Sequence, residues 1–434
     1  MRPHSTLSRG KLLVVAGVIT PLLACQPDAN PAGLSGRLSA SRGGVPVIED
    51  LASPGWQATA ATLVAQAKLS PYAAGRPYAL VGVAQYLAVQ RAEGATGDRD
   101  VEAAASDDET GRGGRSRRES DRGAVAGASV VVLSYLFPLQ TQALEDMVTA
   151  QSDAGPGRSH RAFARGEAIG RAVGAEIVTR ARADGFDTPF TGTIPVGAGF
   201  WISNTTPATV AGGQLPGVRP WFLTSASQFR PAPPPAFGSA GFLAGLAEIR
   251  QISDTRTAEQ TQIAPFWALN AGTPTTAGFW LQAATDGINQ HALSERQATH
   301  LYALLSATMF DAQIGCWDAK LTYWFIRPWQ ADPLITVVPA VGKPNHPSYP
   351  SGHSCISSSA AAVLSRFFPE QRSQLDAMVI EAGLSRMYGG IHYRFDVEAG
   401  QQLGRSVARF TMRADRSGHS VLTPDKEEEG DGPR

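Results

Sequence analysis

The sequence predicts an all-α protein, built as a helical bundle with long irregular loops. Apolar residues recur at helical spacing along most of the chain, whereas the alternation typical of strands is scarce. The chain has 434 residues, 43% hydrophobic and 18% charged, which is enough for one large domain or two ordinary ones with a buried core. The expected helices span residues 56–91, 124–151, 160–184, 239–250, 257–268, 277–288, 293–318, 355–367, 371–388 and 396–412.

Composition divides the chain further. Residues 26–53 are rich in Pro, Gly, Ser and Ala without periodicity, which indicates a tether, and residues 54–290 form an N-terminal helical part. Within that part, residues 93–122 are charged and almost without large apolar side chains, so we expect a disordered loop there. Residues 291–413 form a C-terminal helical part, and the polar, acidic residues 414–434 are expected to be a disordered tail.

A long segment, residues 186–235, separates two groups of expected helices. It is rich in Pro, Gly and Trp and ends in the run PAPPPA (231–236). An irregular stretch of this length in a compact protein is typical of a wrapping or lid-forming loop, and a static cover over the helices is the alternative.

Residues 1–25 have the pattern of an export signal. A basic start precedes an apolar run, residues 12–24, that is shorter than a membrane span. The run ends in LLAC, which resembles a bacterial lipobox and makes Cys25 the expected lipidation site. We therefore expect an exported protein, periplasmic or at the cell surface and lipid-anchored; an ordinary secretory signal with an incidental cysteine is the alternative.

The formal net charge is zero, so nothing indicates a polyanionic partner such as nucleic acid. Any anion site must come from local clustering of basic residues. Membrane contact is expected only through a lipid on Cys25, because no later apolar run reaches membrane-spanning length. Cys316 and Cys355 flank the motifs described next; an exported protein can oxidise such a pair, but we favour two small buried apolar residues.

The first of three chemically informative segments runs from Lys320 to Pro328. Lys320 and Arg327 are seven residues apart, which places both on one side of a helix that Pro328 ends. Beside the aromatic residues 323–325 these cations are partly desolvated and suited to binding an oxyanion. Alone, the pair is more typical of a solvated helix face.

The second segment is Pro350-Ser351-Gly352-His353, directly before an apolar helix. Ser351 is a natural N-cap, and the amides of Gly352 and its neighbours face outward at the positive end of the helix, where anions bind. His353 is placed to exchange a proton with a bound oxyanion. Without the other segments, the motif indicates only the start of a helix.

The third segment contains Arg386, His392 and Asp396. Gly389 and Gly390 interrupt the helical pattern and allow close backbone approach. His392 and Asp396 are four apart, so the carboxylate can hold Nδ1–H of the imidazole and leave Nε2 as a nucleophile or ligand. A histidine of this kind is usually structural when it stands alone.

The combination of the three segments predicts one oxyanion pocket. Between Lys320 and Asp396 they supply three cations, a hydroxyl group, a set of helix-end amides and two histidines with distinct roles. The predicted pocket residues are Lys320, Arg327, Ser351, Gly352, His353, Arg386, His392 and Asp396.

These segments match the signature of the type-2 phosphatidic acid phosphatase/vanadium haloperoxidase superfamily, which is K-x6-R-P, then P-S-G-H, then S-R-x5-H-x3-D. Further stretches resemble its bacterial haloperoxidase-like branch: SQFRPAPPPA (227–236), RTAEQTQIAPFW (256–267), GTPTTAGFW (272–280) and YGGIHYRFDVEAG (388–400). The resemblance implies the all-α fold of vanadium haloperoxidases and acid phosphatases.

In the haloperoxidase interpretation, the resemblance implies vanadate as cofactor, with His392 Nε2 as its ligand and Asp396 orienting that ring. His353 acts as acid and base while hydrogen peroxide binds, Lys320 polarises the peroxide, and a halide is oxidised. The residues implied to neutralise the other vanadate oxygens are Lys320, Arg327, Ser351, Gly352 and Arg386.

Two alternatives stay open. In a phosphatase without a cofactor, the resemblance makes His392 the nucleophile that forms a phosphohistidine, and His353 protonates the leaving alcohol of a phosphoester. A non-catalytic surface lipoprotein that only holds phosphate is the third hypothesis. The pair of His353 and His392 argues against it, because anion binding alone needs no proton donor.

Overall fold

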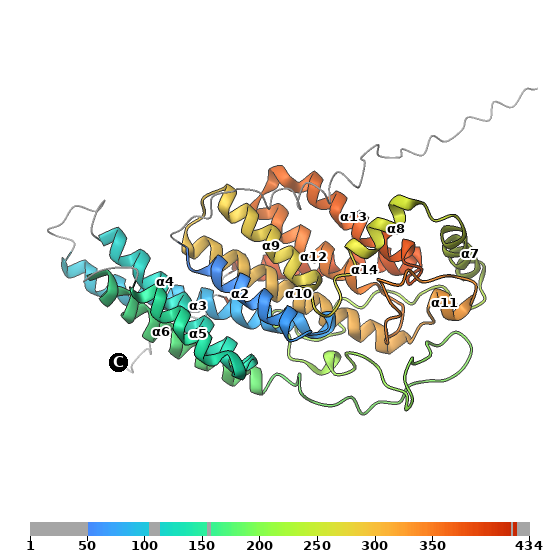
Figure 1. The fold of residues 1–434 in the computed structure, drawn as a ribbon, viewed down its shortest axis with the longest axis horizontal. Coiled ribbons are helices and arrows are strands. Elements are labelled where there is room, and N and C mark those ends of the chain that lie inside the picture. The colour runs from blue at the N-terminus through green and yellow to red at the C-terminus, as the bar shows by residue number, and fades with distance from the viewer. Residues whose placement is uncertain (1–50, 104–112, 154–157, 418–419, 423–434) are drawn as a thin grey trace, which may run out of the picture.

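The computed structural model describes residues 51–103, 113–153, 158–417 and 420–422. Throughout these ranges the regular structure is helical, and an isolated bridge between Phe200 and Phe325 is the one strand-like pairing among the described residues. The predicted all-α bundle with long irregular loops is therefore confirmed (Figure 1).

The helices follow the chain in this order: α2 (Ser53–Gln66), α3 (Pro71–Ala103), α4 (Gly113–Leu136), η1 (Pro138–Gln140), α5 (Thr141–Asp153), α6 (Arg158–Arg182), η2 (Leu215–Gly217), α7 (Ala240–Thr255), α8 (Ala258–Phe266), α9 (Thr275–Gln290), α10 (Glu295–Tyr323), α11 (Pro328–Ala331), α12 (Gly352–Phe367), η3 (Pro369–Gln371), α13 (Arg372–Tyr388) and α14 (Arg394–Ser417). Two expected helices are each split in the structure. The expected helix 56–91 breaks at residues 67–70, and 124–151 breaks at Pro138, which cannot donate a hydrogen bond within a helix.

Helix α10 is the central helix of the body. Ser294 and Gln297 form a capping box at its start. Every residue from Leu301 to Trp317 is buried, which is the pattern of a helix covered on all sides. Helices α3, α12 and α14 pack against it, so the last turn of α10 ends inside the body, where the candidate site forms (Figure 1).

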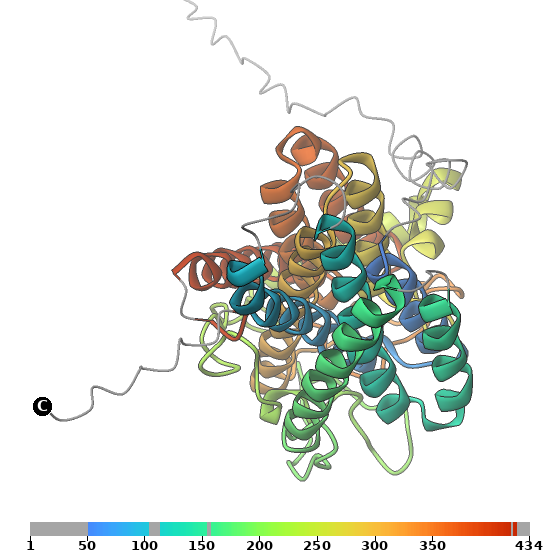
Figure 2. The ribbon, with the colours of Figure 1, turned by 90° about the vertical axis from the view of Figure 1, so that its left-hand side faces the viewer.

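Helices α4, α5 and α6 form a lobe at one end of the molecule, with the outer half of α3 beside them (Figures 1 and 2). Helices α4 and α6 touch backbone to backbone: a Cβ on Gly123 or Gly127 would overlap carbonyls of α6, and a Cβ on Gly166 or Gly170 would overlap carbonyls of α4. Close packing of this kind holds helices together without large apolar side chains.

The expected disordered loop 93–122 differs from the structure. Helix α3 continues to Ala103 and α4 begins at Gly113, while residues 104–112 lie outside the described residues. Ser120 and Asp121 are buried although polar. Composition suggested disorder because large apolar residues are scarce here, but the glycine-mediated contact with α6 takes their place.

The irregular segment between α6 and α7 wraps over α10, as expected for residues 186–235. Asp311 of α10 anchors it, because its buried carboxylate accepts the backbone N–H groups of Trp221 (2.8 Å), Phe222 (2.8 Å) and Leu223 (3.0 Å). A buried carboxylate with three such donors is a well-compensated charge.

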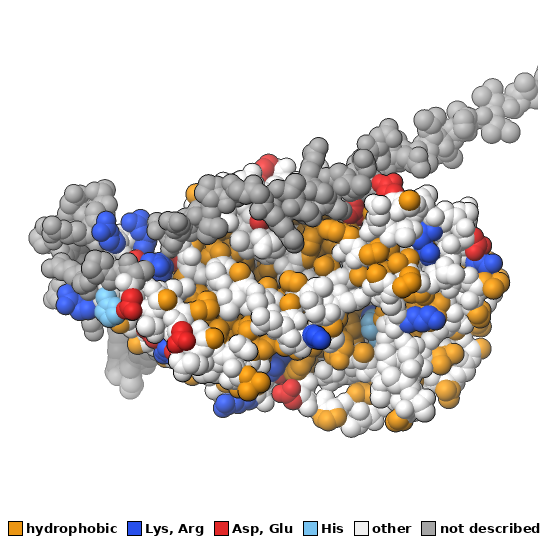
Figure 3. Space-filling model, in the orientation of Figure 1, with side chains coloured by type: hydrophobic (Ala, Val, Ile, Leu, Met, Phe, Trp, Pro, Cys, Tyr) orange, Lys and Arg blue, Asp and Glu red, His pale blue; other side chains and the backbone are white. Residues whose placement is uncertain are grey.

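The expected export signal 1–25, Cys25 and most of the tether 26–53 lie outside the described residues. At the other end, α14 continues to Ser417 and Leu422 is buried, so ordered structure extends beyond the expected start of the tail at residue 414. Within the described residues no helix combines the length and apolar character of a membrane span. On the face drawn in Figure 3, charged side chains lie mainly toward the two ends.

Candidate active site

The three predicted segments meet at the end of α10. Arg327 of the first segment donates to the backbone carbonyl of His346, in the turn before the second segment (3.0 Å), and lies 3.0 Å from His392 Nε2 of the third. The Ser351 amide donates to the backbone carbonyl of Asp396 at 2.9 Å, which joins the second and third segments. The pocket residues predicted from sequence thus lie on segments that contact one another directly.

The first segment is not one helix, contrary to the expectation. Helix α10 ends at Tyr323, and Trp324 takes a left-handed conformation with φ of 47°. Arg327 therefore lies beyond the helix in extended backbone, and Pro328 begins the short helix α11 instead of ending α10. Proline is as compatible with a first helical position as with the end of a helix, so the K-x6-R-P spacing did not distinguish the two.

Lys320 lies in the last turn of α10 and is fully buried. Its ammonium group donates to the backbone carbonyls of Pro347 (2.8 Å), Ser348 (2.9 Å) and Pro350 (2.6 Å), which accounts for all three of its protons. Burial lowers the pKa of Lys320 to about 8. In this arrangement Lys320 holds the turn that leads into Ser351 and contributes its charge, rather than a spare N–H group, to the pocket.

Arg327 is fully buried, and each of its three nitrogens donates at least one hydrogen bond. Its Nη1 donates to the Ile391 carbonyl (2.7 Å) and to His392 Nε2 (3.0 Å), and its Nη2 donates to His346 Nδ1 (3.1 Å). Burial lowers the pKa of Arg327 to about 9, so the guanidinium stays charged at neutral pH.

Arg386, in the last turn of α13, is the third buried cation. Its Nη2 donates to the Ala264 carbonyl at 2.7 Å, and burial lowers its pKa to about 9. The chain turns sharply after it, because Gly390 has a φ of 74° and a Cβ there would meet the Thr336 carbonyl at 2.6 Å. This confirms the expected role of glycine in close backbone approach between Arg386 and His392.

His392 has the tautomer that the spacing to Asp396 predicts. Its Nδ1 lies 2.8 Å from Asp396 Oδ2, which also accepts from the Ser348 hydroxyl (2.5 Å) and the Tyr393 amide (3.2 Å). Nδ1 therefore carries the proton. Nε2 accepts from Arg327, so its lone pair faces the cations. Burial, followed by the charge of Arg327, keeps the pKa of His392 well below its ordinary value, and the ring is neutral.

The second segment forms the start of α12. Ser351 is the N-cap, and its hydroxyl accepts the Ser354 amide at 3.4 Å. Gly352 and His353 occupy the first turn, where backbone N–H groups have no acceptor within the helix. Both are half-buried, whereas Ser351 is buried, so the positive end of the helix dipole opens beside the cations.

His353 is held by a residue that sequence reasoning did not select. Its Nε2 donates to the Trp267 carbonyl at 2.8 Å, and the Trp267 indole donates to buried Glu381 at 2.8 Å. A carbonyl only accepts, so Nε2 carries the proton and Nδ1 is the basic atom. Burial, followed by the charge of Arg386, keeps the pKa of His353 well below its ordinary value.

His346 is the second residue that sequence reasoning missed. Its ring accepts from Arg327 and packs on Trp317, with ring centroids 5.1 Å apart. The only sequence signal was its place in NHPSYP, seven residues before His353. Three histidines thus surround the buried cations, and all three are neutral because burial keeps the pKa of each well below its ordinary value.

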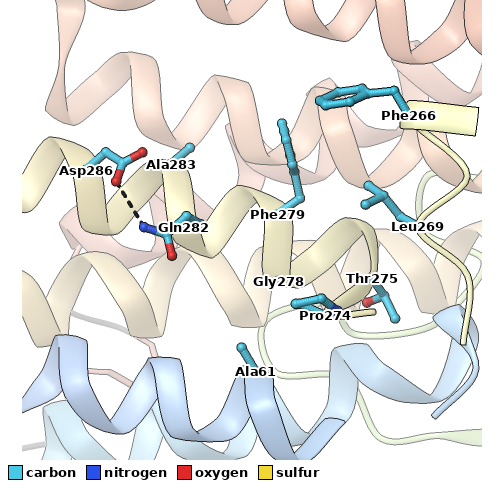
Figure 4. Close-up of a pocket in the computed structure, with 10 residues that line it drawn as sticks. All are labelled: Ala61, Phe266, Leu269, Pro274, Thr275, Gly278, Phe279, Gln282, Ala283 and Asp286. Carbon is cyan, nitrogen blue, oxygen red and sulfur yellow. Dashed lines mark hydrogen bonds between the residues drawn. The ribbon is translucent and has the colours of Figure 1, made fainter. Parts of the chain in front are cut away.

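A separate hollow of about 180 Å³ lies beside the loop that carries Trp267. Ala61, Phe266, Leu269 and Phe279 contribute to its mainly apolar lining (Figure 4). Its lining includes none of the eight predicted pocket residues. The hollow therefore borders the loop whose Trp267 carbonyl orients His353, and it does not border the cations.

Cys316 and Cys355 are both buried and unbonded. This confirms the preferred expectation of two buried thiols over a disulfide.

The family comparison agrees with this geometry. Residues 298–418 match the family model of the PAP2 superfamily, and this range contains all eight predicted pocket residues. This C-terminal part of the chain therefore matches the PAP2 superfamily.

The curated relatives of this chain match only short stretches of it. A non-specific acid phosphatase from Providencia stuartii is 31% identical over 112 residues, covering 25% of this chain and 45% of that protein. Another from Salmonella typhi is 44% identical over 57 residues, covering 13% of this chain and 23% of that protein. The chain thus matches less than half the length of these phosphatases.

Solved structures match the chain over nearly its whole described length. The first bacterial vanadium-dependent iodoperoxidase aligns with a TM-score of 0.67 and 24% identity, covering 83% of this chain and 95% of that one. A holo-type bacterial vanadium-dependent chloroperoxidase aligns with a TM-score of 0.63 and 15% identity, covering 82% and 94%. At these identities the likeness establishes the all-helical fold of those proteins.

Proposed function

We propose that this chain is a vanadate-dependent haloperoxidase-like enzyme that oxidises halide with hydrogen peroxide. The observation that carries the proposal is the unprotonated Nε2 of His392, which Asp396 orients toward Arg327. Lys320, Arg327 and Arg386 are each at most 2% exposed. Asp396 offsets the charges of Lys320 and Arg327. An anion in the pocket would compensate the positive charge that burial leaves poorly solvated.

The residues fit an oxyanion such as vanadate. His392 Nε2 is the ligand atom, Arg327 and Arg386 supply N–H donors and charge, and the amides of Gly352 and His353 supply the helix end. Lys320 contributes charge through the turn that it holds. Vanadate, when bound, supplies the activation of peroxide toward halide.

His353 is suited to act as a base. Its Nε2–H is committed to the Trp267 carbonyl, and its neutral ring leaves Nδ1 free to accept a proton from an incoming peroxide. The Trp267–Glu381 hydrogen bond fixes the carbonyl that orients this ring. Because the His353 ring is neutral before the reaction, it can accept a proton from the peroxide in the first step.

The extent of the structural likeness supports the haloperoxidase proposal over its alternative. Vanadium-dependent peroxidases resemble the chain over more than 80% of its length, including the helices before the signature. A phosphatase acting through a phosphohistidine is the second candidate, favoured by the acid phosphatases that match part of the sequence. In that reaction His353 must start protonated, so the activity is expected to rise toward acid pH.

Reconstitution distinguishes the candidates. The full-length protein is dialysed with orthovanadate and assayed for bromination of a phenol dye with bromide and peroxide, and the metal-free protein is assayed with p-nitrophenyl phosphate. Vanadate-dependent bromination supports the proposal. Phosphate release that vanadate inhibits supports the phosphatase. Binding of phosphate with neither activity supports a non-catalytic phosphate-binding lipoprotein and contradicts both enzymes.

We also propose that the protein is exported and lipid-anchored through Cys25. The support is the sequence of residues 1–25 described above. Cys25→Ser is expected to move the protein from the membrane fraction to the soluble exported fraction. Unchanged membrane association of the variant contradicts the anchor.

A further inference from the structure

The hollow beside the Trp267 loop is large enough for one aromatic ring and is open to solvent. Its volume is about 180 Å³, and an engineered apolar cavity of roughly 150 Å³ already holds benzene. Phe266, Leu269 and Phe279 form its apolar part, and all three are only half-buried. A small apolar molecule can therefore enter the hollow without any opening of the core.

The other end of the hollow is polar and accepts hydrogen bonds. Figure 4 shows Gln282 and Asp286 of α9 at this end, away from Phe266. Gln282 Nε2 donates to Asp286 Oδ1 at 2.9 Å, which leaves the Gln282 amide oxygen as an acceptor. Asp286 is the one charged residue among the described residues that line the hollow, so an anionic ligand is disfavoured. The lining thus suits a neutral ring that carries a hydrogen-bond donor.

The loop at the rim of the hollow is held in a strained conformation. Leu269 and Thr275, which both line the hollow, have φ of 43° and 65°. The left-handed conformation is unfavourable for residues with a side chain, above all for β-branched threonine. The Tyr78 hydroxyl donates to the Pro274 carbonyl at 2.9 Å and holds the loop from outside. Strain of this kind is typical of ligand sites, where it keeps the binding surface preformed.

One loop separates the hollow from the proposed base His353. Phe266 lines the hollow, and the carbonyl of the next residue, Trp267, accepts from His353 Nε2 at 2.8 Å. The Trp267 ring also packs on Phe279, with ring centroids 4.8 Å apart. A ring bound in the hollow would therefore extend an aromatic cluster that holds His353 in place.

We propose that the hollow binds a small neutral phenol, and that this phenol is the organic acceptor of the oxidised halogen. The ring packs against Phe266 and Phe279, and its hydroxyl group donates to the Gln282–Asp286 pair. The acceptor role rests on the proposed function, whereas the binding does not. Hypohalous acid, the product of that function, breaks its oxygen–halogen bond. A ring carbon supplies the electron pair of the new carbon–halogen bond, and the ring proton and the hydroxide leave as water.

A ligand-observed NMR titration of the full-length, vanadate-free protein tests the binding. Phenol is expected to bind with a Kd of about 1 mM, as suits a ligand of this size. Anisole has the same ring but no O–H donor, and it should bind about tenfold more weakly. No saturable binding of phenol would overturn the proposal, and equal affinity for the two compounds would contradict the hydrogen bond at the polar end.

Two variants test where phenol binds. Ala61 lines the hollow from α2, across from α9 (Figure 4), so Ala61→Leu fills the space and should weaken phenol binding by about tenfold or more. Ala58→Leu is the matched control, because Ala58 is exposed one turn earlier on α2 and does not line the hollow. Its affinity should equal that of the wild type. Equal affinity of Ala61→Leu and Ala58→Leu would overturn the proposed place of binding.

A third variant keeps the test decisive if a thermal melt shows that Ala61→Leu does not fold. Asp286→Ala removes the acceptor at the polar end of the hollow. It should weaken the binding of phenol and leave the binding of anisole unchanged. An unchanged Kd for phenol would contradict the proposal.

Kinetics of the vanadate-reconstituted protein test the acceptor role. The bromination rate should saturate with phenol at a KM near the measured Kd. The KM should rise in Ala61→Leu by the same factor as the Kd, and not in Ala58→Leu. A rate that does not saturate, or one KM for all three proteins, would show that free hypohalous acid leaves the protein and would overturn the acceptor role. If the wild type brominates nothing, the proposed haloperoxidase fails, while the titration still decides the phenol site.

Discussion

Arg327 Nη1 lies 3.0 Å from His392 Nε2, so a buried guanidinium hydrogen-bonds the same nitrogen that Asp396 leaves without a proton. The cation faces the lone pair while the carboxylate holds the opposite side of the ring. This contact explains how one imidazole is kept neutral, oriented and surrounded by positive charge.

The charge of Arg327 should have a measurable effect on the pKa of His392. After burial, Arg327 is the largest cause that lowers the pKa of His392, whereas Arg386 is not among its leading causes. Removing a nearby cation favours the imidazolium, so Arg327→Gln should raise the pKa of His392, and Arg386→Gln should raise it less. Two-dimensional NMR of the histidine ring nitrogens follows both. Equal shifts, or a further fall in Arg327→Gln, would contradict the contact.

Replacing Asp396 should lower the enzyme activity more than it lowers the thermal stability. In Asp396→Asn the side-chain oxygen no longer carries the charge that holds Nδ1–H, and the wrong tautomer of His392 becomes populated. Activity should fall by about a hundredfold or more. Ser348→Ala, which removes another donor to the same oxygen, is the control and should lose less. Steady-state kinetics and a thermal melt check both variants, and an active Asp396→Asn enzyme would reject the orienting role.

Anion affinity should depend on pH through Lys320. Its folded-state pKa is lowered to about 8, so the ammonium charge is lost as the pH rises through that value. Phosphate affinity should therefore be highest below about pH 8 and fall above it, by up to about tenfold per pH unit. Lys320→Met, if its thermal melt shows a folded protein, should bind more weakly and lose this component. Identical pH profiles for the two proteins would show that Lys320 does not contribute its charge.

Asp311 should anchor the irregular segment between α6 and α7. Asp311→Asn weakens the acceptor for three buried N–H groups, at a cost of about 1–3 kcal/mol. Denaturant unfolding should show this loss, and limited proteolysis should cut first in residues 183–239. The control is Asp318→Asn, which breaks a partly exposed pair with Arg230 and should cost about 1 kcal/mol or less. Equal stability of the two variants would contradict the anchor.

Periodicity predicted the helices well where an apolar face packs on the core, as in α10 and α12. Periodicity failed where close backbone contact, rather than an apolar face, holds the helix in place. Residues 113–122 have few large apolar side chains, and no periodic pattern reveals that Gly123 and Gly127 bring α4 against the backbone of α6. Pro138 itself indicates a break, but the apolar pattern continues on both sides of it and therefore predicts one helix instead of two.

The site was more predictable than the fold around it, because its chemistry lies in three short segments. The pairing of His392 with Asp396 followed from their spacing, although His392 precedes α14 rather than lying within it. Trp267 and His346 could not be found this way. Their contacts to His353 and Arg327 depend on how loops return to the pocket, and neither residue type nor spacing records that path.

Binding of orthovanadate to the wild-type protein and to His392→Ala tests the central claim most directly. Equilibrium dialysis should show one vanadate per wild-type chain and at least about a hundredfold weaker binding to the variant, because the nitrogen ligand is lost while the cations remain. A folded wild-type protein that binds no vanadate, or a His392→Ala variant that binds it equally well, would contradict the account.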